Sequence, residues 1–366
     1  MEDNKFKIGV IGLGYVGLPL AVLFSSKYSV IGLDTDTSRV TKVNQFLDET
    51  NELDSELLEK ALNTNLSVTD NYKDIKDCNI YILTGPTPID KMKNPDLSYL
   101  LDATEDIGKL ISKGDIIIYE STVYPGCTEE ECVPVLEKIS GLKYNQDFYC
   151  GYSPERINPG DKKNTIDKIT KVTSGSNEYS SKIVDELYSS VISAGTYNVS
   201  SIKVAEASKA IENAQRDLNI SFVNELALMF DKMKIDTTEV LNAASTKWNF
   251  LRFRPGLVGG HCISVDPYYL TFKSESMGYS PNVILSGRMV NERMGDFVAE
   301  KLINLMNDKM IPVKGSNILI LGITYKEDCP DIRNTKIPEV YKFLTDHGAN
   351  VSVHDPYAVT KTVFDK

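Results

Sequence analysis

Short apolar runs alternate with segments of helical periodicity along the first half of the chain. Residues 6–11 (FKIGVI) form an apolar, β-branched run typical of a buried strand, and residues 18–27 carry a helical pattern. A second apolar run at 29–33 ends in Asp34. The alternation continues through predicted strands at 79–84, 115–120 and 148–152 and predicted helices at 53–63 and 97–111. This order predicts the α/β class, with a doubly wound parallel sheet over residues 1–198.

After this sheet the pattern changes to helix alone. Residues 200–233 contain no glycine or proline and begin with serine, a good N-cap, so we predict one long helix. Helical patterns continue to about residue 246 and return at 282–308, on either side of a loop at 247–270 rich in arginine, glycine and proline. The sequence therefore predicts a central all-helical domain over residues 199–308.

A second strand–helix–strand pattern lies near the C-terminal end of the sequence. Residues 317–322 (NILILG) predict a buried strand, followed by a helix at 337–347 and a strand at 351–354. Two strands and one helix cannot bury both faces of a sheet alone. We therefore expect residues 309–366 to be a truncated, Rossmann-like C-terminal unit, or to dock on the preceding domain.

The composition is globular and limits the partners. Of 366 residues, 42% are hydrophobic and 25% are charged, and the net charge is −11. This diffuse acidic balance argues against nucleic acid or an anionic membrane as the main partner. The sequence has no signal-peptide pattern at its start and no run of 18 apolar residues. Six scattered cysteines without a CxxC pair, and three histidines, favour cytoplasmic thiols and no metal site.

A glycine-rich motif joins the first strand to the first helix. Gly12 permits a tight turn, Gly14 lets the backbone approach a pyrophosphate, and Gly17 allows close packing of helix on strand. The helix N-terminus then presents free N–H groups to phosphates. Asp34 would accept hydrogen bonds from ribose hydroxyls and would repel a 2′-phosphate, which favours NAD over NADP. The alternative interpretation is a tight strand–helix turn with a surface aspartate.

A polar stripe follows one side of the long helix. Glu206, Lys209, Asn213, Arg216 and Asn224 recur at helical spacing. A solvated face usually carries Lys/Glu pairs, whereas asparagine is a poor helix former and needs a reason to be there. The stripe is therefore a functional face or, alternatively, a solvated one. The other sides of the helix carry the apolar residues Val204, Ala207, Ala210, Ala214, Leu218 and Phe222.

A basic, glycine-rich loop follows the long helix. Residues 252–267 (RFRPGLVGGHCISVDP) combine arginines, which bind phosphates, with glycines that let backbone approach a ligand. Cys262 lies beside His261 in this basic loop, a setting that lowers a thiol pKa. A single cysteine is more often a small buried hydrophobic residue, so both interpretations stay open.

Three loops of the first domain begin where predicted strands end. Residues 153–160 (SPERINPG) occupy such a position, where ligands bind in open α/β sheets. There Glu155 and Arg156 either face a substrate or pair with each other. Thr87 and Thr122 also follow strands and are candidates to line a cofactor cleft.

Together these segments resemble the nucleotide-sugar 6-dehydrogenases, the family of UDP-glucose dehydrogenase, and most of all the branch that oxidises UDP-N-acetylhexosamines. The likeness spans essentially the whole chain and includes the SPER and GGHC forms, which glucose-oxidising members typically lack. It rests on GLGYVGLPLA (12–21), ESTVYPG (120–126), GYSPERINPG (151–160), SSIKVAEASKAIEN (200–213), RFRPGLVGGHCISVDPYYL (252–270) and LGITYKED (321–328).

The resemblance implies an activity and partners. The expected reaction is the NAD-dependent, four-electron oxidation of the C6 alcohol of a UDP-N-acetylhexosamine to the uronic acid, through a cysteine thiohemiacetal and thioester. The glucosamine, galactosamine and mannosamine epimers stay open. The expected protein is a cytoplasmic homodimer that feeds surface polysaccharide synthesis, with neither nucleic acid nor membrane as a partner. Residues 309–366 resemble the first strand–helix–strand of the family's C-terminal UDP-binding domain.

The resemblance also implies roles for single residues. Cys262 is the expected nucleophile, Lys209 and Asn213 are expected to stabilise oxyanions, with Lys209 also expected to transfer a proton. Glu155 and Asp266 are expected to position or activate water. The expected NAD contacts are Gly12, Gly14, Tyr15, Val16, Gly17, Asp34, Arg39, Thr87, Thr122 and Arg333. The expected substrate contacts are Arg156, Ile157, Arg216, Arg254, Gly256, Gly260, Tyr325 and Lys326.

Three other functions fit part of the pattern. A UDP-glucose 6-dehydrogenase would oxidise the C6 alcohol of another sugar. A two-electron dehydrogenase of the 3-hydroxyacid type also carries a lysine and an asparagine on a long helix, but it would need no Cys262 and would release one NADH. A non-catalytic nucleotide-binding or redox-sensing protein would bind NAD or a UDP-sugar without turnover.

Overall fold

The computed structural model describes residues 6–157, 161, 163–261, 263–327 and 331–358. The chain divides into two compact units, Met1–Ala210 and Ile211–Lys366. The boundary falls within the longest helix, α7 (Ile202–Met233). Cys262 and residues 158–160 of the SPERINPG segment lie outside the described residues.

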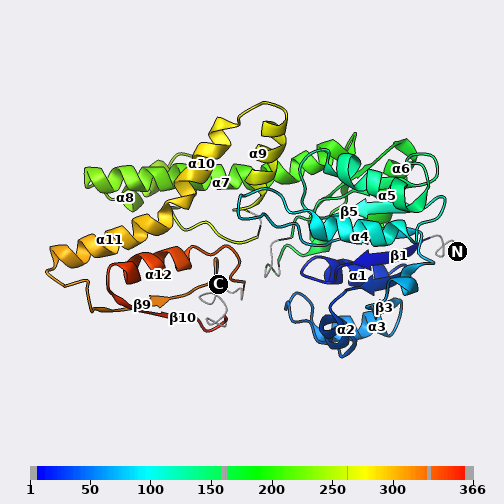
Figure 1. Cartoon of the computed structure of the whole chain (residues 1–366), viewed down its shortest axis with the longest axis horizontal. Coiled ribbons are helices and arrows are strands. Elements are labelled where there is room, and N and C mark those ends of the chain that lie inside the picture. Colours follow the sequence, from blue (N-terminus) through cyan, green and yellow to red (C-terminus); the bar gives the residue numbers. More distant parts are fainter. Residues whose placement is uncertain (1–5, 158–160, 162, 262, 328–330, 359–366) are drawn as a thin grey trace. The chain divides into compact units, whose positions relative to one another are not determined.

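A twisted sheet forms the centre of the first unit (Figure 1). Its order, within the described residues, is β3-β2-β1-β4-β5-β6-β7-β8. The strands are β1 Lys7–Ile11, β2 Ser29–Leu33, β3 Leu66–Thr69, β4 Ile80–Leu83, β5 Ile116–Tyr119, β6 Tyr149–Tyr152, β7 Lys171–Gly175 and β8 Thr196–Asn198. The central strands β4 and β5 are continuous apolar runs because helices cover both of their faces.

The α/β class and the parallel core of the sheet agree with the sequence prediction. Strands β1, β2, β4, β5 and β6 match the predicted runs, and their pairings are parallel. Three strands were not predicted: β3, β7 and β8. The structure also differs from a wholly parallel sheet, because β7 runs antiparallel to β6, with Gly151 opposite Gly175.

Helices cover the two faces of this sheet. Ile116 and Ile118 of β5 belong to the core that packs against α1, α3 and α6. Tyr119, the next residue in β5, points to the other face, where its hydroxyl lies 3.2 Å from Thr104 Oγ1 of α4. The helices are α1 Gly17–Ser25, α2 Thr37–Asn44, α3 Ser55–Leu62, α4 Ser98–Gly108, α5 Val133–Ser140 and α6 Glu178–Ser189.

The second unit is helical and ends in a small sheet (Figure 1). Its helices beyond α7 are α8 Thr237–Ala244, α9 Asp266–Ser276, α10 Asn282–Glu292, α11 Met294–Asp308 and α12 Ile337–Asp346. The strands β9 (Asn317–Leu321) and β10 (Asn350–His354) pair in parallel. Buried Ala299 of α11 and Leu344 of α12 form the core of this part.

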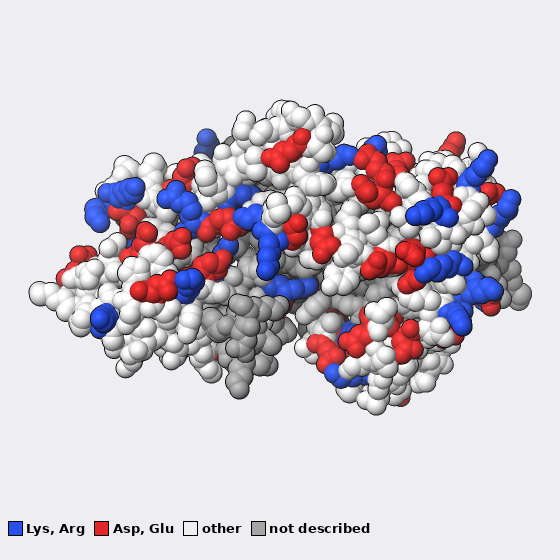
Figure 2. All heavy atoms as spheres, in the orientation of Figure 1, with Lys and Arg blue, Asp and Glu red and all other residues white. Residues whose placement is uncertain are grey.

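The surface mixes acidic and basic side chains. On the face that Figure 2 draws, Asp and Glu are interspersed with Lys and Arg. Among the helices of the described residues, none has both the length and the apolar character needed to cross a membrane.

Candidate active site

The glycine motif forms the turn between β1 and α1. Gly12 has φ +92°, a backbone conformation that residues other than glycine rarely adopt. A Cβ on Gly17 would lie 1.8 Å from the Gly12 carbonyl oxygen, so only glycine fits there. A Cβ on Gly14 would meet nothing within 4 Å, so that backbone is open to a ligand. The N-terminus of α1, at Val16, has no side-chain cap; Leu18 N donates to Gly14 O at 3.3 Å, and the N–H of Gly17 is left for an anion.

Asp34 and Arg39 lie against this turn. The Asp34 carboxylate accepts hydrogen bonds from Leu13 N at 2.8 Å and Asp36 N at 2.9 Å. Each carboxylate oxygen can accept a further bond, so ribose hydroxyls remain possible donors. Buried Arg39 donates from Nε to Leu13 O at 2.8 Å and pairs with Asp48 at 2.7 Å. Its Nη1 finds no acceptor among the described residues. An open Gly14, an uncapped helix and a buried unused donor fit the binding of NAD.

The loops after β4 and β5 are joined to each other. Thr87 Oγ1 donates to Thr122 O at 2.6 Å, which brings two of the predicted cofactor residues together. Ser121 Oγ donates to Gly85 O at 2.7 Å in the same region. Thr84, which sequence reasoning did not single out, donates to Gly12 O at 2.7 Å and so ties the β4 end to the glycine turn.

Glu206 of α7 holds the far end of the second loop. Its carboxylate accepts hydrogen bonds from Gly126 N at 2.5 Å and Thr128 N at 2.9 Å. The side chain is fully buried. Burial raises the pKa of Glu206 to about 7, and the hydrogen bonds from Thr128 and Gly126 offset that rise only in part.

We expect the stability of the fold to depend on the charge of Glu206. A carboxyl whose pKa is higher in the folded state contributes stability that is fully present below the unfolded pKa and is lost as pH rises through the folded pKa. Relative to a Glu206→Gln variant, the free energy of unfolding should therefore fall by about 3 kcal/mol as pH rises from about 4 to about 8. Urea unfolding of both proteins across this range measures the difference, and a pH-independent difference would contradict it.

The polar stripe on α7 is largely buried. Glu206, Lys209, Asn213 and Asn224 are all buried, whereas Arg216 is exposed. The apolar side is mixed: Val204 is 44% and Phe222 57% exposed, whereas Ala210 and Ala214 are buried. The interpretation of the stripe as a solvated face is therefore wrong for every member except Arg216. The helix also begins as expected, since Ser201 Oγ accepts a hydrogen bond from Val204 N at 3.3 Å.

Three predicted catalytic residues lie on or against this helix. Lys209 is only 7% exposed, and its side chain makes no hydrogen bond or ion pair with a residue that the structure describes. Asn213, one helical turn further on, donates from Nδ2 to Asp266 Oδ2 at 2.6 Å. Asn213 and Asp266 are both buried, and Asp266 is the first residue of α9. The bond uses one of the two N–H groups of the amide, which leaves a second for a ligand.

Glu155 and its neighbours follow β6. Glu155 Oε1 accepts hydrogen bonds from the backbone of Arg156 and of Ile157. Its Oε2 lies 3.5 Å from Nζ of Lys171, a buried lysine of β7. The Arg156 guanidinium donates to Thr170 O at 2.8 Å.

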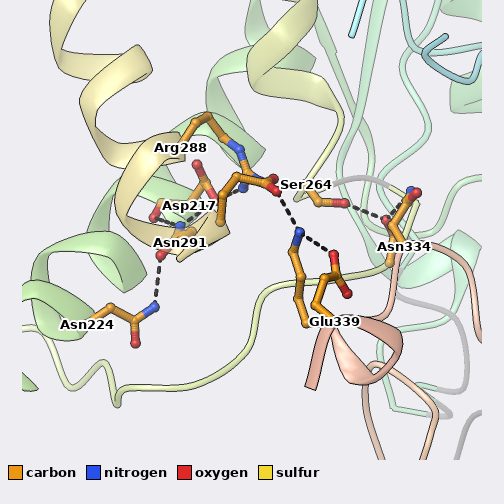
Figure 3. Close-up of polar contacts among 10 residues, drawn as sticks. Asp217, Asn224, Ser264, Arg288, Asn291, Asn334 and Glu339 are labelled. Atoms are coloured by element: carbon orange, nitrogen blue, oxygen red, sulfur yellow. Dashed lines mark hydrogen bonds and ion pairs between the residues drawn. The ribbon is translucent and has the colours of Figure 1, made fainter. Parts of the chain in front are cut away.

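The described part of the GGHC segment packs against a turn before α12. Gly260 has φ +86°, and a Cβ on it would lie 2.7 Å from the ring of Tyr325. Gly260 N donates to Arg333 O at 3.0 Å. The Gly260 carbonyl accepts from Asn334 Nδ2 at 3.0 Å and from Ser264 Oγ at 2.7 Å (Figure 3). Three predicted residues, Gly260, Tyr325 and Arg333, are thus brought together.

A buried polar network holds the start of the same loop. Asn224 donates to Gly256 O at 3.0 Å and accepts from Gly256 N at 2.9 Å, so its amide fixes the backbone at a predicted substrate residue. Asn224 also donates to Asn291 of α10, which bonds to Asp217, and Asp217 pairs with Arg288 at 2.6 Å (Figure 3). Both asparagines of the stripe thus have buried partners that account for their position in a helix.

Three further predicted substrate residues are Arg254, Lys326 and Arg216. Arg254 is exposed and donates to Asn242 at 2.5 Å. Lys326 is half-buried. Arg216 is also exposed, and its side chain makes no hydrogen bond or ion pair with another described residue.

The sequence matches one protein family over most of its length. The UDP-glucose/GDP-mannose dehydrogenase family matches through its NAD binding domain at residues 6–192, its central domain at 203–293 and its UDP binding domain at 319–365. A UDP-N-acetyl-D-glucosamine 6-dehydrogenase of Pseudomonas aeruginosa is 56% identical over 357 residues, which cover 98% of this chain and 84% of the relative. The chain belongs to the UDP-glucose/GDP-mannose dehydrogenase family.

Other relatives agree with this assignment. Protein CapL of Staphylococcus aureus is 54% identical over 95% of this chain and 81% of its own length. Among solved structures, the UDP-D-ManNAc dehydrogenase of Pyrococcus horikoshii is 31% identical, with a TM-score of 0.89 over 96% of this chain and 84% of that one. The family resemblance drawn from the motifs is therefore confirmed, as is the prediction of NAD. This family member is an NAD-dependent dehydrogenase of UDP-sugars.

Proposed function

We propose that the chain oxidises the C6 alcohol of UDP-N-acetyl-D-glucosamine twice, to the uronic acid, with NAD as the oxidant. The observation that carries the chemistry is the set of buried polar groups on α7: Lys209 without a described partner, and Asn213 aligned by Asp266. The choice of sugar is supported by two relatives named UDP-N-acetyl-D-glucosamine 6-dehydrogenase at 56% and 55% identity. Relatives named for UDP-N-acetyl-D-mannosamine are more distant, at 33% and 34%.

The first part of the proposed mechanism concerns binding and the first oxidation. The turn at Gly12–Gly17 and the N-terminus of α1 would hold the pyrophosphate of NAD, with Asp34 on the ribose hydroxyls. Two NAD molecules, bound in turn, would supply the oxidant, each taking up one hydride from C6. Lys209 is the candidate to accept the alcohol proton, because its amine is buried on α7 one helical turn from Asn213.

The second part concerns covalent capture of the aldehyde. The Cys262 thiolate forms a bond from its sulfur to C6, and the carbonyl π electrons become an alkoxide. Lys209, as an ammonium, and the free N–H of Asn213 would stabilise that oxyanion. The second oxidation leaves a thioester on Cys262. Water then attacks the thioester, a carboxylate takes its proton, and the thiolate leaves. Glu155 is the proposed base, and Asp266 supports the reaction by orienting Asn213.

The experiment that tests this proposal counts NADH released per sugar consumed. The substrates are UDP-N-acetylglucosamine, its galactosamine and mannosamine epimers and UDP-glucose. We expect two NADH per UDP-N-acetylglucosamine and slower turnover of the others. One NADH per sugar would favour the two-electron dehydrogenase, and faster turnover of UDP-glucose would overturn the choice of sugar. A Cys262→Ser variant should no longer release two NADH, and two NADH from that variant would refute the thioester scheme.

Further expectations from the sequence stay predictions. The bounds of the three predicted domains, the cytoplasmic location and the use of the product in surface polysaccharide synthesis are in this group. The homodimer also stays a prediction, and it is supported by exposed apolar side chains on α7, namely Val204, Ile211, Phe222 and Met229.

A further inference from the structure

Four side chains of the first unit form a buried ionic cluster that the proposed mechanism uses only in part. Lys171 is the first residue of β7, Glu120 follows β5, Tyr188 lies on α6 and Glu155 follows β6. Lys171, Glu120 and Tyr188 are each at most 3% exposed, and the Glu155 side chain is 12% exposed. The cluster thus reaches from the interior of the sheet to the proposed base.

The contacts within the cluster are asymmetric. Lys171 Nζ donates to Glu120 Oε2 at 2.6 Å but lies 3.5 Å from Glu155 Oε2. Glu120 Oε1 accepts a hydrogen bond from the Tyr188 hydroxyl, so both oxygens of Glu120 have donors. Glu155 Oε2 is buried and accepts no hydrogen bond from the described residues, so Lys171 is the cation that faces it.

The charges in this cluster do not cancel. One ammonium faces two carboxylates, and burial alone would lower the pKa of Lys171, but Glu120 and Glu155 raise it above its ordinary value. Lys171 is therefore held as a cation. A structural ion pair would be complete with Glu120 alone, since a single carboxylate neutralises a single ammonium. The second carboxylate, Glu155, is the one without a hydrogen bond at Oε2.

We propose that Lys171 is a positioning residue for Glu155, which it keeps aligned for hydrolysis of the thioester through the contact of its ammonium with Oε2. Glu120 accepts a hydrogen bond from the ammonium and so competes with Glu155 for it, and Tyr188 donates to the other oxygen of Glu120. This inference rests on the proposed role of Glu155 as the base. Among the described residues, the charged or titratable groups around Glu155 are Lys171 of β7, Glu120 at the end of β5, Tyr188 of α6 and the adjacent Arg156, whose guanidinium donates to Thr170 O.

The inference predicts opposite effects of two substitutions on the acidic side of the pH–rate profile. Lys171→Met removes the cation that favours the charged form of Glu155, so the acidic edge of kcat should move up by about one pH unit. Glu120→Gln removes the competing anion, so the ammonium interacts with Glu155 alone. The acidic edge of kcat should therefore move to lower pH. Lys171→Arg keeps the charge and should restore the edge toward that of the wild type.

The experiment measures kcat against pH with UDP-N-acetylglucosamine and NAD, together with intact-mass detection of the acyl-enzyme after quenching. In Lys171→Met we expect kcat to fall at least about ten-fold and the acyl-enzyme to accumulate, because hydrolysis becomes slow. Lys182→Met is the matched control, since Lys182 lies on the exposed surface of α6 with 77% of its side chain accessible. Its edge should not move.

Each outcome decides between the two proposals. If Glu155→Gln accumulates acyl-enzyme but the edge does not move in Lys171→Met, the role of Lys171 is refuted and that of Glu155 stands. If Glu155→Gln accumulates no acyl-enzyme, the proposed role of Glu155 as the base is refuted, and with it the role of Lys171 that rests on it. If Lys171→Met does not fold, Glu120→Gln and Lys171→Arg still test the inference. The inference is refuted if the acidic edge of kcat moves in the same direction in both of these variants, or moves in neither.

Discussion

Replacing Lys209 with methionine should lower kcat by about 10²- to 10³-fold without reducing stability. The loss follows from the proposed role of Lys209 on the alkoxide, since removing one preformed donor to an oxyanion costs about that factor. Stability should stay the same or rise, because a buried amine without a described partner costs desolvation energy that methionine does not. Steady-state kinetics and thermal unfolding of the same preparation measure both effects.

Lys203→Met supplies the matched control on the same helix. Lys203 lies on α7 two turns before Lys209, its side chain is 53% exposed, and it pairs with Glu130 at 3.3 Å. An exposed pair contributes little, so kcat and stability should both stay close to the wild type. A Lys209→Met enzyme that keeps full activity would exclude Lys209 from the chemistry. One that loses stability and activity together would indicate a structural role instead.

The sequence predicted the cofactor turn well because its signal is local. Gly12, Gly14 and Gly17 lie between a strand and a helix, and the steric demands on Gly12 and Gly17 come from neighbouring backbone that the same motif specifies. The asparagines of α7 were also informative. Asn213 and Asn224 are poor helix formers, and each proves to be tied to a buried partner from another segment.

The rest depended on contacts between distant segments. Periodicity located the polar stripe of α7 but not the direction it faces, because a buried polar side and a solvated one have the same spacing. The structure shows that four of the five stripe residues are buried, as are Ala210 and Ala214 of the apolar set. Lys171 and Glu120 lie 51 positions apart and meet only because β5 and β7 flank β6. A lysine at the start of a short strand gives no sign from sequence alone that it is buried. The antiparallel β7 was missed because its short run, KVTSG, is weakly apolar.

Two substitutions in the glycine motif should separate folding from cofactor binding. In Gly17→Ala the new Cβ would lie 1.8 Å from Gly12 O and 2.4 Å from Thr84 Oγ1, so β1 and α1 must move apart. We expect the free energy of unfolding of the protein without cofactor to fall by about 3 kcal/mol, near the upper end for overpacking, and NAD binding to be lost with it.

Gly14→Ala should keep the stability of the fold and weaken the binding of NAD. No atom lies within 4 Å of the position that its Cβ would take, so the fold accommodates the methyl group and unfolding in the absence of NAD should be unchanged. The same open position is where the pyrophosphate would approach the backbone, so affinity for NAD should fall by about ten-fold or more. Titration calorimetry and urea unfolding of both variants measure the two quantities. If Gly14→Ala binds NAD as the wild type does, the pyrophosphate does not lie against Gly14. If Gly17→Ala is as stable as the wild type, the turn relaxes more easily than its contacts indicate.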